Sequence, residues 1–195
     1  MDPSAVEQAK LRFIKAQKAL AAFKAATNFA DAEEAWTDFL IAASAIYSKL
    51  EQGAKGHPKS EPWYGRKKKE RKDDPLLRYI HHARNSNEHG IERVVGVTPP
   101  NRDGYGRHLK FNERVPIKFE GRDPKTGEVL GTGEGVFAGP TLKPIAVYDR
   151  KHGDHFVPPE THMGKDIQYR DFVDGLGDAT LNYLRSLVAD AESLL

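Results

Sequence analysis

The spacing of apolar residues changes from a helical to a strand-like period at residue 91, and this change constrains the fold most strongly. Before it, apolar side chains recur at steps of three and four, which places them on one face of a helix. The same spacing returns near the end of the chain. It predicts four helices, over residues 4–26, 28–51, 75–88 and 168–194. Asn28 and the Asp74-Pro75 pair are typical helix starts, and Gly90 is a typical helix stop.

Residues 53–74 contain prolines and several glycines, and we expect them to form a loop between the second and third helices. Beyond residue 91, apolar and polar residues alternate between marked turns, which is typical of short strands. The expected strands cover residues 91–97, 108–112, 115–119, 128–137 and 142–148. We therefore predict an α+β fold that is mainly α, a four-helix bundle with a small antiparallel β meander inserted between helices three and four.

This prediction corresponds to a single domain over residues 1–195. Residues 4–90 and 166–195 form the helical bundle in it, and residues 91–165 form the β insertion. Gly175 and Gly177 are expected to interrupt the first turns of the last helix.

The composition excludes several classes of protein. The 195 residues contain no cysteine, which rules out disulfides, cysteine-ligated zinc, iron–sulfur clusters and thiol catalysis. Lys and Arg number 30 against 28 Asp and Glu, so the formal charge of +2 does not indicate a general nucleic-acid coat protein. The first ten residues do not resemble a signal peptide, because no apolar run follows a basic start, and the longest apolar stretch, Phe39 to Tyr47, is far shorter than the roughly 18 residues of a membrane span. We expect a cytoplasmic protein with no membrane partner.

The densest polar chemistry lies at the end of the third helix. Helical spacing places His82, Asn85 and His89 on one stripe. His81, Arg84 and Glu88 form the adjacent stripe. The guanidinium of Arg84 can clamp a phosphate, and His89 can exchange protons near neutral pH. This pairing suits metal-independent cleavage of a phosphodiester by a ribose 2′-hydroxyl, whereas the alternative is an ordinary solvated helix face.

The segment Arg84-Asn85-Ser86-Asn87-Glu88-His89 matches an R-x(4–6)-H motif, with a polar residue directly after the arginine. It closes the third helix of an expected bundle, and in this it resembles the HEPN superfamily. The resemblance covers residues 4–90 and the final helix, but not the β segment. It implies a metal-independent endoribonuclease that needs no cofactor and leaves a 2′,3′-cyclic phosphate and a 5′-hydroxyl. Ile91 stands where some toxin members have a tyrosine, so control by modification of that tyrosine is not indicated.

The resemblance also implies roles for individual residues. Arg84 would contact the scissile phosphate, His89 would act as general acid or base, and Asn85 would orient the pair. His82, Glu88 and His81 would support them. A homodimer would bring two motifs together across a cleft, because five positions separate Arg84 and His89 by about 140° around an ideal helix.

Such a protein could serve as a toxin or defence effector with an antitoxin or regulatory partner. Two alternatives stay open. One is a non-catalytic HEPN-like module that binds RNA, a nucleotide or a protein, and the other is a structural interaction protein.

A basic run directly precedes the third helix. Six of its seven residues are cations, and such clusters attract backbone phosphates. The RNA-binding candidates are Arg66, Lys67, Lys68, Lys69, Arg71 and Lys72. Trp63 and Tyr64 lie just upstream and could stack on bases. The alternative is a solvated, flexible loop.

Two further patterns are weak. The glycines of the segment 131–135 resemble a phosphate loop, but no helix follows them, which favours hairpin glycines. His152, Asp154, His155 and His162 lack the spacing of metal ligands, so we expect no metal.

Overall fold

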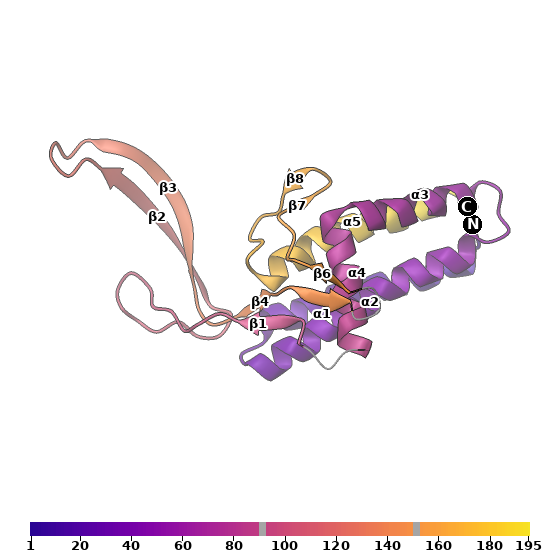
Figure 1. The fold of residues 1–195 in the computed structure, drawn as a ribbon, viewed down its shortest axis with the longest axis horizontal. Coiled ribbons are helices and arrows are strands. Elements are labelled where there is room, and N and C mark those ends of the chain that lie inside the picture. The colour runs from indigo at the N-terminus through magenta and orange to yellow at the C-terminus, as the bar shows by residue number, and fades with distance from the viewer. Residues whose placement is uncertain (90–92, 150–152) are drawn as a thin grey trace.

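The computed structural model describes residues 1–89, 93–149 and 153–195, except for the side chains of Glu88 and His89. The expected stop at Gly90, Ile91 with the first part of the first expected strand, and His152 lie outside the described residues. Within the described residues the fold is α+β, as predicted, and contains five helices (Figure 1). These are α1 (Pro3–Ala25), α2 (Phe29–Ala54), α3 (Ser60–Asp73), α4 (Pro75–His89) and α5 (Val173–Glu192).

The first two helices form a tightly packed antiparallel pair. α2 starts after Asn28, the predicted cap, and α1 starts at Pro3 after Asp2, a cap that was not predicted. The backbone N–H of Ser4 donates to the Asp2 carboxylate at 2.7 Å, and the N–H of Asp31 donates to the Asn28 side chain at 3.0 Å. α5 packs against α1 along much of its length, and the two chain ends lie close together at one end of the bundle (Figure 1).

Two clusters of buried side chains hold the helices together. In the first, Trp36 stacks on Phe39 with ring centroids 5.0 Å apart, and Phe23 from α1 meets the Trp36 edge. In the second, Leu50 from α2 packs with Leu187 from α5. Burial of such large apolar side chains supplies most of the folding free energy.

Residues 53–74 are not a loop, so the expected four-helix HEPN-like bundle is wrong. α3 occupies most of this segment, and the bundle has a fifth helix. Trp63 and Tyr64 are buried at 7% and 6% exposure, and the Tyr64 hydroxyl donates to the Tyr47 carbonyl at 3.0 Å. The rest of the segment is Lys, Arg and Glu, which are good helix formers.

The β segment is not one meander but four separate antiparallel pairs, because its strands pair in twos within the described residues. The long hairpin joins β2 (Arg114–Arg122) to β3 (Val129–Ala138). The short pairs are β1 (Val95–Val97) with β4 (Leu142–Pro144), β5 (Val147–Asp149) with β6 (Asp154–Phe156), and β7 (Thr161–His162) with β8 (Lys165–Asp166).

Two expected boundaries also differ. Residues 108–112 form no strand, and only an isolated bridge joins Arg102 to His108. The last helix begins at Val173 because Tyr169, at φ 55°, has a left-handed backbone that ends the preceding turn. Gly175 and Gly177 lie inside α5 and do not interrupt it, so that prediction is wrong. A Cβ on Gly177 would lie 2.6 Å from the Leu20 side chain, so glycine lets α5 approach α1 closely.

The β2–β3 hairpin projects away from the helices as an arm (Figure 1). Its base is tied to them: the Asn112 amide donates to the carbonyl of Phe23 at 2.8 Å, and Arg114 pairs with Asp174 at 2.5 Å. Among the described residues, no helix combines the length and apolar character that crossing a bilayer requires.

Candidate functional site

The start of α4 is fixed by Asp74, and this sets the direction of the helix that carries most of the candidate residues. Its carboxylate accepts the N–H of Leu77 at 3.0 Å, the N–H of Met163 at 2.7 Å and contacts the His162 ring nitrogen Nδ1 at 2.9 Å. Burial alone would raise the pKa of Asp74, but these hydrogen bonds outweigh burial and lower it. Asp74 is therefore a charged cap at neutral pH.

Arg84, Asn85 and His81 form one polar chain along α4. Arg84 Nη1 donates to Asn85 Oδ1 at 3.2 Å, and Asn85 Nδ2 lies 3.4 Å from His81 Nε2. Because the amide oxygen faces Arg84, its N–H group faces the histidine, and the facing ring nitrogen acts as the acceptor. Asn85 thus links Arg84 to a neutral imidazole.

His81 is neutral for a second reason. Burial, the largest cause, and the positive charges of Arg71, His82 and Arg84 together lower the pKa of His81 to about 4. The carboxylate of Asp149 acts in the opposite direction. The cations around His81 thus outweigh the opposing charge.

His82 connects α4 to the β5–β6 hairpin. Its ring stacks on Phe156 at 3.6 Å between centroids, and Nδ1 lies 3.5 Å from Asp149 Oδ2. Two further hydrogen bonds hold the segment 145–148 against α4. The Tyr79 hydroxyl donates to the Ile145 carbonyl at 2.8 Å, and Ser86 Oγ donates to the Tyr148 carbonyl at 3.0 Å. This side of α4 is therefore a packing face as well as a polar one.

Glu88 and His89 are the last two residues of α4. The side chains of both lie outside the described residues, so the pairing of Arg84 with His89 stays a prediction.

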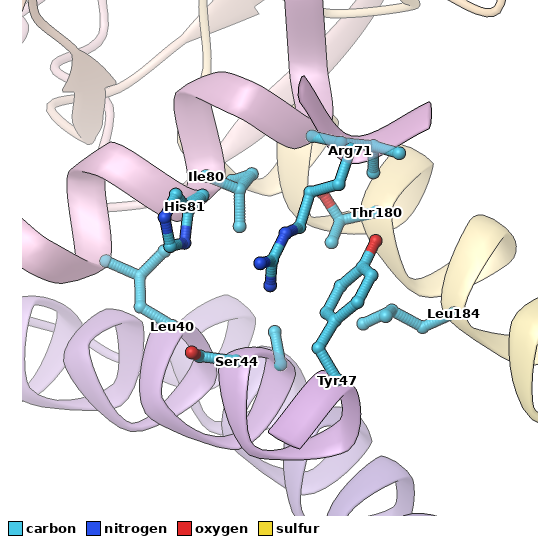
Figure 2. A pocket seen from close by; sticks show the side chains of 10 residues that line it. Leu40, Ser44, Tyr47, Arg71, Ile80, His81, Thr180 and Leu184 are labelled. Carbon is cyan, nitrogen blue, oxygen red and sulfur yellow. The ribbon is translucent and has the colours of Figure 1, made fainter. Parts of the chain in front are cut away.

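The basic run lies on helix α3, and its cations divide into three groups. Lys67 pairs with Glu70 at 3.3 Å and Asp190 at 3.1 Å, and Lys68 pairs with Glu51 at 3.4 Å. Arg71 turns inward, with its guanidinium carbon 4.5 Å from the Tyr47 ring centroid (Figure 2). The remaining three are exposed to solvent: Arg66, Lys69 and Lys72.

The prediction that Trp63 and Tyr64 stack on bases is wrong. Both rings are buried against the bundle and belong to its core. Their burial holds α3 against α2, which is what presents the exposed cations at the surface.

A cleft of about 390 Å³ opens where the end of α3, the first half of α4 and the β5–β6 hairpin meet. Its lining brings distant parts of the sequence together and includes residues that the sequence did not single out. The cations and histidines are Arg71, Lys72, Arg78, His81 and His82, and the other lining residues are Asp149, Asp154 and Phe156. No sequence signal marks Arg78 or Phe156, because the contact of α4 with this hairpin creates the cleft.

Among the described residues, no group of three or more His, Asp or Glu side chains is arranged to hold a metal ion. His155 packs on Tyr148 at 4.7 Å between rings, and His162 is engaged with Asp74. The glycines of residues 131–135 lie on strand β3, as expected for a hairpin.

Comparisons with known proteins give no relative. No family model matches the chain, and neither the curated proteins nor the solved structures contain a significant match. The functional argument therefore depends on the residues and geometry described above.

Proposed function

We propose that the protein is a metal-independent endoribonuclease of HEPN type, acting as a homodimer. The observation that carries the proposal is the chain of polar contacts from Arg84 through Asn85 to His81, which leads from the R-x(4)-H segment to a cationic cleft. A site of this kind offers charge stabilisation and proton transfer within one helix.

In this proposal the 2′-hydroxyl of a ribose attacks the adjacent phosphorus. A histidine base removes the hydroxyl proton, the new O2′–P bond forms, and the P–O5′ bond breaks as an acid protonates O5′. Arg84 stabilises the charge on the phosphorus oxygens. His89 of one chain serves as base or acid, and His89 of a second chain serves in the other role, since one motif supplies only one such histidine.

The RNA strand would reach this site along α3. Arg66, Lys69 and Lys72 are exposed on that helix, and Lys72 also lines the cleft. Backbone phosphates are attracted to such a row of cations in a salt-dependent way.

A non-catalytic RNA-binding module is the second candidate, and the packing of α4 favours it. His82 and Ser86, next to the proposed catalytic residues, anchor the β5–β6 segment. In this reading the polar residues of α4 are structural and the cleft only binds RNA. A toxin or defence role with an antitoxin partner remains a further proposal.

The test is cleavage of a mixed-sequence RNA in EDTA, with mapping of product ends. We expect cyclic phosphate and 5′-hydroxyl ends from the wild type, and at least about 100-fold slower cleavage by Arg84→Ala and His89→Ala. His108→Ala, at an exposed loop histidine, is the matched control and should cleave normally. A folded wild type that binds RNA without cutting it would instead support the binding module.

A further inference from the structure

Arg71 is a cation of α3 whose charged group is directed into the helical bundle. Figure 2 shows its guanidinium between the side chains of Tyr47 on α2 and His81 on α4. Within the described part of the chain, no carboxylate forms an ion pair with Arg71, and its guanidinium lies over the face of the Tyr47 ring. A partly buried cation without a counter-ion is costly, so such a group is typical of sites that receive an anion.

Two spaces share Arg71 and His81 as lining residues. The inner one is an apolar pocket between α2, α4 and α5 of about 20 Å³, which has room for a single water-sized group. The outer one is the cleft of about 390 Å³. A ligand in the cleft therefore reaches the guanidinium from the solvent side, and its bulk stays outside the inner pocket.

The charges at the cleft favour an anion. Lys72 and Arg78 add two exposed cations to Arg71. Of the two carboxylates, Asp149 lies against His82, and Asp154 is exposed on the β6 strand. His81 is uncharged at neutral pH and can donate a hydrogen bond through Nδ1, since Nε2 accepts from Asn85.

We propose that Arg71, Lys72 and Arg78 form a phosphate-binding site that is separate from Arg84, since Arg78 precedes Arg84 by six residues, or nearly two turns of α4. The forked donors of arginine match phosphate oxygens, and the cleft volume falls at the small end of ligand sites, which suits a single nucleotide unit. The phosphate belongs either to an RNA strand or to a free mononucleotide. Only the RNA case rests on the proposed function.

The test is calorimetric titration of the full chain at low salt with inorganic phosphate, a 5′-mononucleotide and a short single-stranded RNA. Arg71→Met keeps the length of the side chain and removes its charge. We expect it to weaken mononucleotide binding by about ten-fold or more. Arg185→Met is the matched control. The guanidinium carbon of Arg185 also lies near an aromatic ring, 5.9 Å from the centroid of Phe13, but Arg185 is on the exposed face of α5. It should bind like the wild type.

Two further measurements guard against a folding defect in Arg71→Met. Lys72→Gln/Arg78→Gln alters exposed side chains only and should also weaken mononucleotide binding. In the wild type, the NMR-monitored pKa of His81 should rise by about one unit on adding the mononucleotide, since a bound anion offsets the charge of Arg71 on α3 and Arg84 on α4. Asp149 on β5 and His82 on α4 face the same ring in both the free and the mononucleotide-bound wild type.

Failure of either proposal is recognisable. Wild type that binds none of the three probes at millimolar concentration, or Arg71→Met that binds them as well as wild type, overturns the phosphate site. Binding of the RNA alone assigns the phosphate to a strand, and binding of the mononucleotide alone assigns it to a free ligand. If the wild type cleaves no RNA while Arg84→Ala still binds the mononucleotide, the ribonuclease proposal is overturned and the phosphate site stands.

Discussion

Asp74 shows how one side chain fixes the site from outside it. Asp74→Ala removes the cap of α4, the hydrogen bond to the Met163 N–H and the partner of His162. Because these groups are largely buried, we expect the free energy of unfolding to fall by about 2–3 kcal/mol, measured by urea denaturation at pH 7. Asp74→Asn keeps a capping oxygen and should lose about half as much. Equal losses in the two variants would mean that the cap does not control the start of α4.

His81 makes stability depend on pH. Its folded pKa of about 4 lies below its ordinary value of 6.5, so the unfolded chain binds more protons between these two values. Stability is therefore complete above pH 6.5 and is lost as the pH falls toward 4. We expect the wild type to lose about 2 kcal/mol between pH 7 and pH 5 through this histidine.

The measurement is urea denaturation at both pH values for wild type and His81→Gln. The variant should lose about 2 kcal/mol less than the wild type on acidification. His108→Gln, at an exposed position, is the control and should behave like the wild type. An unchanged pH dependence in His81→Gln would place the acid sensitivity elsewhere.

At the scale of elements, α3 shows where sequence patterns stop being informative. The run of Lys and Arg has no apolar period, so the sequence predicted a loop. The helix is held by residues far away in the chain: Glu51 pairs with Lys68, Asp190 pairs with Lys67, and the Tyr183 hydroxyl donates to Glu70 at 2.7 Å. By contrast, α1, α2 and α4 follow from local spacing and caps, and the sequence predicted them.

The exposed cations of α3 can be tested separately from the cleft. If RNA lies along this helix, Arg66→Gln/Lys69→Gln should weaken RNA binding and reduce the slope of log affinity against log salt by about 1.4, since each phosphate contact on a single strand contributes about 0.7. Fluorescence anisotropy over a salt series measures this slope. Lys15→Gln/Lys18→Gln on α1 removes the same charge and should leave the slope unchanged. Equal changes in the two pairs would indicate a general charge effect.

On the scale of the whole molecule, long-range packing decides what the sequence could not. The residues of the β2–β3 hairpin and its turn at 123–127 were predicted, because they are neighbours in the chain. The pairing of β1 with β4 was not, since about 45 residues separate them, and neither was β6, the second strand of the hairpin that lines the cleft. The cleft is thus a product of tertiary packing, although His81, His82 and Arg71 on its walls were candidates from the sequence.

The arm itself should contribute little to the stability of the helices. β2 and β3 pair only with each other among the described strands, and outer apolar residues such as Phe119 and Leu130 are 55% and 71% exposed. Ile117 and Gly135 are cross-strand partners, so an Asn-Gly turn in place of residues 118–134 closes a shorter hairpin. We expect the melting temperature of this variant to lie within about 3 °C of the wild type by calorimetry.

The base of the arm should behave differently. Asn112 adopts a left-handed backbone at φ 59°, donates to the Phe23 and Ala26 carbonyls at the end of α1, and accepts from the Thr141 hydroxyl. Asn112→Ala loses these hydrogen bonds and strains the backbone, so it should lower the melting temperature by about 6 °C, equivalent to about 2 kcal/mol. If the shortened arm destabilises the protein more than Asn112→Ala does, the outer hairpin supports the bundle directly, and the separation of arm from body is wrong.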